Sequence, residues 1–144
     1  MLGRHAKPDT TVDLRNTCPA ESDLGNAGLL NTRLTGADLS GADLTGALFT
    51  HSDLSDSDLS ESFVLDADFT DATMVSSNLH RANLAQADFT GGDLRYATMT
   101  RVNLKGATLA RANVGNADLR DSTHDEVTAV TGAIKNPATR GVWW

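Results

Sequence analysis

A large apolar residue occupies every fifth position of this chain from Leu24 to Leu119, twenty times in succession and without a slip. The residue two positions earlier is Ala, Ser, Thr or Gly at every step except Val102. Neither regular element has this period, because a helix repeats its faces every 3.6 residues and a strand every 2. A helix would spread these apolar residues over all of its faces, and a strand would send alternate ones to opposite sides.

A chain that turns a corner every five residues satisfies this pattern. On each short side, the large residue and the small residue two positions before it point inward together. Four sides close a coil of twenty residues, and successive coils stack through backbone hydrogen bonds at ~4.8 Å. The remaining positions are mostly Asp, Asn, Thr, Ser, Gly and Arg, of which the small polar residues and glycine suit corners. The sequence therefore predicts an all-β, quadrilateral parallel β-helix over residues 22–121, with about five coils and a length of ~24 Å.

The phenylalanines indicate that a coil has four sides. In a twenty-residue coil, residues twenty apart stack directly, and three of the four phenylalanines have this spacing. Stacked aromatic neighbours gain ~0.5–1.5 kcal/mol beyond the burial of their area. We expect one core column made of Leu29, Phe49, Phe69, Phe89 and Leu109.

The repeating unit resembles that of a known family. Ala37-Asp38-Leu39-Ser40-Gly41 and Ala82-Asn83-Leu84-Ala85-Gln86 follow the pattern A(D/N)LXX. This pattern, which holds from Ser22 to Asp121, resembles that of the pentapeptide-repeat proteins. The resemblance implies a right-handed quadrilateral β-helix. It also suggests one family branch whose acidic rods look like duplex DNA to DNA gyrase and related enzymes, and which confers fluoroquinolone resistance.

The two ends of the chain depart from the repeat. At the N-terminus, Pro19 falls where a large inward residue belongs, so residues 1–21 are expected to form a tail or a cap. At the C-terminus, Thr123-His124-Asp125-Glu126 has the form of a capping box, which predicts a short helix within residues 122–144 that covers the last coil.

The chain ends in Val142, Trp143 and Trp144, which admit two interpretations. They could cover the open end of the coil stack, because an uncovered end exposes core side chains and backbone groups. They could instead form a homodimer contact, which the resemblance suggests because some family members pair through their C-terminal ends.

Composition restricts the class of function. Nineteen acidic and 12 basic residues give a net charge of −7, which disfavours direct binding to nucleic acid or to an anionic membrane. The single cysteine, Cys18, allows no intrachain disulfide, and the first residues contain no apolar segment typical of a secretory signal. We expect a soluble, cytoplasmic protein.

We find no pattern that predicts catalysis, a cofactor or a metal site. His51 and His80 fall on different sides and different coils, so they cannot converge as zinc ligands. The Asp-x-Asp pairs at 56–58 and 66–68 lack the glycine and the closing glutamate of a calcium loop. No glycine-rich phosphate loop precedes a helix, and a uniform rod offers no pocket.

The distribution of charge is the feature that goes beyond a scaffold. No Lys or Arg lies between Arg33 and Arg81, and the acidic residues in this gap are Asp38, Asp43, Asp53, Asp56, Asp58, Glu61, Asp66, Asp68 and Asp71. Five of them directly precede a large inward residue, where a carboxylate can make local hydrogen bonds. The other four follow such a residue by two positions, where we expect the repeat to demand nothing, and they should ring one coil. Solubility and ion pairs such as Glu61 with Arg81 could explain them, and so could a protein partner.

Two functions follow from different classes. The first is a DNA-mimicking binder and regulator of DNA gyrase or topoisomerase IV, as the resemblance suggests. Seven basic and fourteen acidic residues over residues 22–121 give about one net charge per ~3.4 Å of rod, against one per ~1.7 Å for B-DNA. The alternative is a structural or protein–protein interaction rod with another partner, for which outward-pointing Phe63 and Leu65 are the candidate contact.

Overall fold

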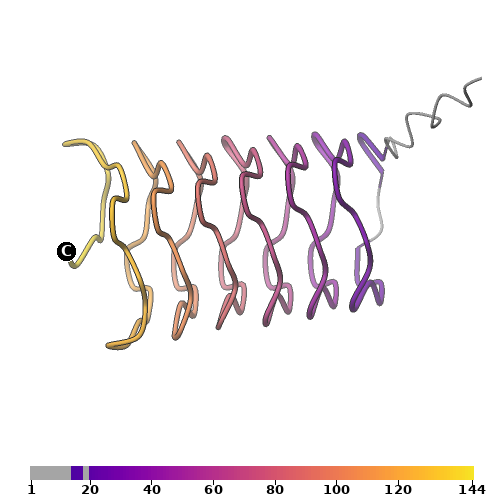
Figure 1. Ribbon diagram of the computed structural model, residues 1–144. Helices are drawn as coiled ribbons and strands as arrows, with labels where there is room; N and C mark the ends of the chain where they lie inside the picture. Colours follow the sequence, from indigo (N-terminus) through magenta and orange to yellow (C-terminus); the bar gives the residue numbers. More distant parts are fainter. Residues whose placement is uncertain (1–13, 18–19) are drawn as a thin grey trace, which may run out of the picture.

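The computed structural model describes residues 14–17 and 20–144, and in them the chain coils into a rod (Figure 1). Four ladders of single-residue parallel β-bridges run along the rod and join residues twenty apart. We name the four faces in chain order after the first bridged residue of each ladder: face A begins at Asp23, face B at Gly28, face C at Arg33 and face D at Asp38. The described residues contain no helix, and no strand extends beyond a single bridge.

The stack contains one coil more than the five expected. Within the described residues each ladder joins six levels, from Asp23 to Thr123 on face A and from Asp38 to Arg140 on face D. Pairing also extends below residue 22, because the amide of Leu14 donates to Arg33 O at 2.8 Å and the amide of Glu21 to Ser40 O at 2.9 Å. Cys18, Pro19 and residues 1–13, on which part of the predicted N-terminal cap depends, lie outside the described residues.

Each corner is a tight turn with a fixed backbone requirement. The amide of Ala37 donates to Leu34 O at 2.9 Å, and the amide of Ser52 donates to Phe49 O at the same distance, closing four-residue turns. The third residue of each turn has a positive φ, as a type II turn requires. Our expectation that the repeat demands nothing at this position is therefore wrong. Gly, Asn and Asp adopt this conformation at the lowest cost.

The interior is filled by the two inward positions of each side. Large inward residues from Leu34 to Leu119 have an exposed fraction of 0%. The ring centroids of Phe49 and Phe69 lie 4.8 Å apart and those of Phe69 and Phe89 lie 5.0 Å apart, with 6° between planes in both pairs. This separation matches the spacing between bridged strands, so the backbone ladder sets the stacking distance.

The hydroxyl groups of the small inward serines donate hydrogen bonds to the backbone. Ser57 and Ser62 each donate to the carbonyl oxygen three residues earlier, at 2.6 Å, and Ser77 does so at 2.9 Å. A buried hydroxyl without an acceptor would destabilise the fold, so this bond explains why Ser replaces Ala at these positions.

The predicted C-terminal helix is wrong, because residues 123–140 form a sixth coil. Thr123, Ala129, Ile134 and Arg140 continue the four ladders, with an extra residue in each of two corners. In the first of these corners, Asp125 Oδ1 accepts hydrogen bonds from the amides of Thr128 and Gly106, both at 3.0 Å. The polar residues that resemble a capping box thus close a turn. A coil here pairs the open backbone groups of the coil before it, which a helix would leave unpaired.

A second six-residue corner repeats the arrangement. Asn136 Oδ1 accepts hydrogen bonds from the amides of Thr139 and Asn116, both at 3.1 Å. In each of these corners the threonine hydroxyl donates to a carbonyl of the preceding coil, Leu104 O for Thr128 and Val114 O for Thr139. The shared pattern is Asp or Asn followed three residues later by Thr.

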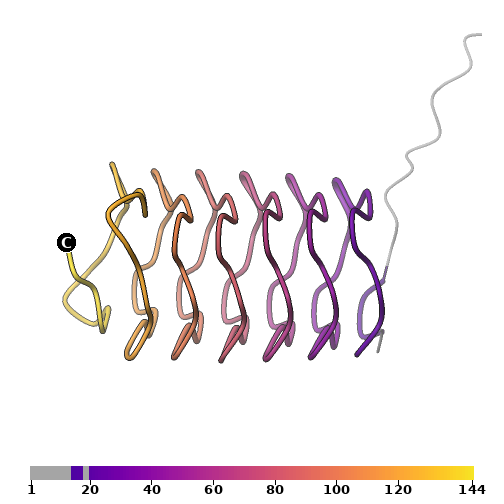
Figure 2. The same ribbon diagram turned by 90° about the horizontal axis from the view of Figure 1, so that it is seen from below.

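The tryptophans lie against the end of the core. On the earlier coils the residue after each bridge is the large inward one. On the last coil three of these positions hold His124, Lys135 and Gly141, all of which are exposed. The Trp143 ring stacks on His124 at 4.0 Å, and Trp144 meets Trp143 edge-on at 4.6 Å. Figure 2 shows this segment beyond the sixth coil, at the end of the rod. The two indoles therefore cover core that the last coil itself does not fill.

We predict that replacing Phe69 by Ala lowers the free energy of unfolding by about 3–5 kcal/mol, because it leaves a cavity in a closed column. Phe63→Ala is the matched control, since Phe63 is 58% exposed and its loss should change stability by about 0.5 kcal/mol or less. Urea unfolding followed by circular dichroism measures both. A Phe69→Asp variant that melted like the parent would contradict a dry interior.

We predict that Gly141→Ala detaches the tryptophan cap. Gly141 has a φ of +73°, and an added Cβ would lie 2.4 Å from the backbone nitrogen of Arg120, so alanine should cost about 1–3 kcal/mol. Both tryptophans of the chain lie in this cap, so intrinsic fluorescence reports on it alone. Emission should shift to longer wavelength in Gly141→Ala and stay unchanged in Gly28→Ala, where an added Cβ meets nothing within 4 Å.

Candidate protein-binding surface

The nine carboxylates between Arg33 and Arg81 surround the rod and do not gather on one face. We call them the acidic belt. Five point outward from the faces: Asp43 on face A, Asp68 on face B, Asp53 on face C, and Asp38 and Asp58 bridged to each other on face D. The other four, Asp56, Glu61, Asp66 and Asp71, lie at four successive corners and are exposed.

The outward-facing carboxylates support the turns that follow them. Asp38 Oδ1 accepts a hydrogen bond from the amide of Ser40 at 3.0 Å, and Asp68 Oδ1 accepts one from the amide of Thr70 at 2.8 Å. Asp68 also accepts a bond from the hydroxyl of Thr50 in the coil below, at 3.0 Å. These aspartates form Asx turns, so the fold alone explains why aspartate occurs at these positions.

These hydrogen bonds lower the pKa of several outward-facing carboxylates. The side-chain hydrogen bond of Ser40 lowers the pKa of Asp38, and that of Thr45 lowers the pKa of Asp43. Burial raises the pKa of Asp68, but the hydrogen bonds of Thr70 and Thr50 outweigh it, so that pKa is also lowered. Asp38, Asp43 and Asp68 therefore carry their negative charge at neutral pH.

The corner carboxylates are the ones available to a partner. Glu61 pairs with Arg81 of the next coil at 3.3 Å, and Asp71 lies 4.0 Å from His51. Both pairs are more than half exposed, and such pairs contribute little to stability. Asp56 and Asp66 make no ion pair with any described residue. Glu61 has no conformational advantage at a positive φ of 59°, so its acidity is not explained by the turn.

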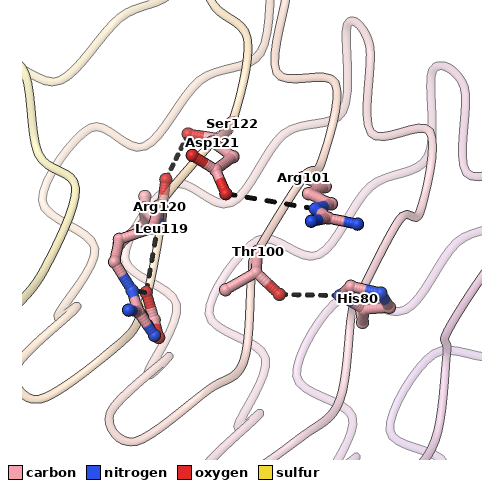
Figure 3. A network of polar contacts seen from close by, with 8 residues as sticks. His80, Thr100, Arg101, Leu119, Arg120, Asp121 and Ser122 are labelled. Atoms are coloured by element: carbon pink, nitrogen blue, oxygen red, sulfur yellow. Dashed lines mark hydrogen bonds and ion pairs between the residues drawn. The ribbon is translucent and has the colours of Figure 1, made fainter.

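The C-terminal half of the rod carries a different charge pattern. Arg120 holds the carboxylate of Asp118 with two nitrogens. Arg101 lies 4.0 Å from Asp121, toward which it points in Figure 3. On the same edge His80 Nδ1 lies 2.7 Å from the hydroxyl of Thr100. Between residues 82 and 121 five basic residues accompany four acidic ones, so this half is close to neutral. The charge of the rod is thus concentrated in the belt.

A shallow notch interrupts the edge between faces D and A. It has a volume of about 180 Å³, is lined by Glu21, Ser40, Gly41, Ser60 and Glu61, and lies where Gly41 contributes no side chain. Across residues 14–17 and 20–144 no three His, Cys, Asp or Glu side chains are grouped so that they could hold a metal ion.

Large apolar side chains are exposed near the belt, and sequence reasoning found only some of them. Phe63 is 58% exposed, and Leu65 is partly buried. Leu48 and Leu30, which are 41% and 47% exposed, were not predicted. The signal that could have found them is an apolar residue at a position that is polar in most other repeats.

The predicted dimer contact lies against the core of its own chain. Val142, Trp143 and Trp144 are partly buried and pack on the core cluster. The indole N–H of Trp144 is buried and has no hydrogen-bond acceptor among the described residues. The described part of the chain includes no helix long and apolar enough to span a bilayer.

Comparison with known proteins identifies the class of protein. Residues 42–119 match the family described as a pentapeptide repeat region, and residues 20–50 match pentapeptide repeats. The first match covers more than half of the chain, which therefore belongs to the pentapeptide-repeat family. No curated protein sequence matches the chain.

Several solved structures are similar to this chain. HetL of Nostoc sp. strain PCC 7120, involved in heterocyst differentiation regulation, is 25% identical, with 85% of this chain and 71% of HetL covered and a TM-score of 0.44. A pentapeptide repeat protein of the Arabidopsis thaliana thylakoid lumen is 26% identical, with 84% and 63% covered and a TM-score of 0.45. Full-length QnrB1, a plasmid-mediated fluoroquinolone resistance protein, is 16% identical, with 88% and 92% covered and a TM-score of 0.31. Membership of the family rests on the matched repeats.

We predict that the fold loses stability in acid. A carboxyl whose pKa is lowered in the folded state stabilises the fold fully above its unfolded pKa of about 3.9, and this contribution is lost as the pH falls through the folded pKa. Asp38, Asp43 and Asp118 have pKa values lowered by side-chain hydrogen bonds. The urea midpoint should therefore be flat from about pH 7 to 5 and fall below about pH 4. A midpoint that rises between pH 5 and 3 would show that repulsion within the belt outweighs these bonds.

Proposed function

We propose that this protein is a non-enzymatic rod that binds a basic surface of another protein through the acidic belt. The observation that carries the proposal is the concentration of carboxylates in a stretch without Lys or Arg. Nine carboxylates and no Lys or Arg lie between residues 34 and 80, which span just over two coils. These coils occupy ~11 Å of the rod, so the belt carries about one charge per ~1.3 Å, against one per ~1.7 Å for B-DNA.

The belt supports DNA mimicry better than the average charge of the rod does. Its charges lie on all four sides of a stiff shaft, as phosphates surround a duplex, and hydrogen bonds hold five of its carboxylates in place. The partner we propose is the DNA-binding surface of a type II topoisomerase, DNA gyrase or topoisomerase IV, because one branch of the pentapeptide-repeat family acts on these enzymes through acidic rods. Such a partner places the protein in the cytoplasm. A homodimer through Val142, Trp143 and Trp144 would lengthen the rod and its acidic surface.

The second candidate is an interaction rod whose partner is not a topoisomerase. The specific observation that favours it is the exposure of Phe63 and Leu48 within the belt, since a surface that only imitates phosphates needs no apolar side chains.

We predict that low-micromolar protein inhibits supercoiling by DNA gyrase or relieves its poisoning by a fluoroquinolone. The variant Asp56→Asn, Glu61→Gln, Asp66→Asn, Asp71→Asn should lose at least about tenfold in potency, because it removes four exposed charges. Asn and Gln already occupy such corners at Asn26 and Gln86, so the variant keeps the turns.

The matched control removes four charges from the other end of the rod. Asp88→Asn, Asp93→Asn, Asp118→Asn and Asp121→Asn together make the same change in net charge outside the belt, and should leave potency within about twofold. If the parent protein alters neither gyrase readout, the topoisomerase partner is wrong. If both quadruple variants lose potency equally, net charge and not the belt is responsible.

A further inference from the structure

Four large apolar side chains interrupt the polar exterior on three neighbouring coils. Leu30 lies on the first bridged coil, Leu48 on the second, and Phe63 and Leu65 on the third. Leu30, Leu48 and Phe63 are between 41% and 58% exposed, and Leu65 is partly buried. We call these four residues the apolar strip.

The bridge ladder of face B places the residues of the strip on neighbouring coils. Leu48 is bridged to Gly28 below it and to Asp68 above it. Leu30 follows Gly28 by two residues, and Leu65 precedes Asp68 by three. Leu30, Leu48 and Leu65 therefore lie on three successive coils, along a line that crosses face B diagonally. Phe63 precedes Leu65 by two residues and extends the strip around the corner onto face A.

Carboxylates border the strip on faces A and B, whereas Arg33 lies beyond Leu30 on face C and Arg81 lies at the corner between faces D and A. Asp43 is bridged to Phe63 on face A, Asp68 is bridged to Leu48 on face B, and Asp66 directly follows Leu65. On faces A and B and the edge between them, no Lys or Arg occurs in the first four bridged coils, up to residue 90. An apolar surface with a mainly acidic rim is complementary to an apolar surface with a basic rim.

We propose that the apolar strip is the docking site for a partner segment that carries apolar and basic side chains together, such as a basic amphipathic helix. This inference rests on the proposed function and specifies which faces of the belt make the contact. Burial of the strip supplies a non-directional attraction, and the acidic rim selects a basic partner and fixes its orientation.

The acidic rim disfavours two other occupants. A second copy of this chain placed strip against strip would bring Asp43, Asp66 and Asp68 toward the same carboxylates of its partner. A lipid surface with anionic headgroups would be repelled by the same residues. A basic protein segment is the occupant that satisfies both features of the strip.

Binding of two synthetic peptides to the full chain tests the proposal. Both are roughly 14 residues long, ~20 Å as a helix, and have the same number of lysines; one is a Leu/Lys amphipathic peptide and the other a Ser/Lys peptide. We expect the Leu/Lys peptide to bind at least about tenfold more tightly, by isothermal titration calorimetry.

The variant Leu48→Thr, Phe63→Asn should abolish this advantage. Asn83, directly above Phe63, and Thr108, higher on face B, show that both replacements suit their ladders. Tyr96→Asn is the matched control: Tyr96 is 58% exposed, as Phe63 is, but lies at the corner between faces C and D, and its replacement should preserve the advantage.

The other outcomes separate this inference from the proposed function. If both peptides bind equally and the strip variant changes neither, the strip is not a docking site, while binding of a basic partner by the belt stands. If neither peptide binds at low salt, the proposed function fails and the inference with it. If light scattering shows a dimer that Phe63→Asn dissociates, a second copy occupies the strip and the inference is wrong.

Discussion

The narrow interior of the coil is the constraint on which the rest of the structure depends. Four short sides enclose so little space that the residue two positions before each large inward side chain is small at every step except Val102. The coil rise then equals the stacking distance of the side chains, as the 4.8 and 5.0 Å separations of the phenylalanine rings show. Because the inward positions are fixed by packing, the five-residue register also fixes the face and the coil on which each outward residue lies.

The acidic residues of this protein occur at two kinds of outward position, and they occur there for different reasons. An aspartate before a large inward residue closes its own turn, as Asp38 does with Ser40, and the fold alone accounts for it. At the third residue of each turn the backbone is left-handed, which accounts for glycine, asparagine and part of the aspartate there. Glu61 neither precedes a large inward residue nor gains from a left-handed backbone. Asp56 and Asp66 make no ion pair with any described residue. The surplus charge therefore lies at the corners, where a partner can reach it, and the apolar strip crosses the same coils.

The register of the repeat made much of this predictable from the sequence, because it depends on contacts that repeat. It places Phe49, Phe69 and Phe89 in one column and the corner acids on successive sides. The C-terminal coil was not predictable from local pattern, since Thr123 to Glu126 has the polar spacing of a helix cap and also that of a six-residue turn. The choice depends on the open backbone of the preceding coil, which pairs with Ala129 through Ala107 and Leu109. Leu30 and Leu48 stand at repeat positions that are mostly polar, so the sequence marks each of them singly, but their alignment with Phe63 and Leu65 depends on how the coils stack.

Deletion of one complete coil tests the twenty-residue period most directly. Removing residues 62–81 joins Glu61 to Ala82 in register, whereas removing residues 62–80 joins it one residue out of register and turns every following side chain to the wrong side. We expect the first variant to keep a cooperative thermal transition by circular dichroism and the second to lose it. Equal melting of the two variants would contradict a square coil with a fixed interior.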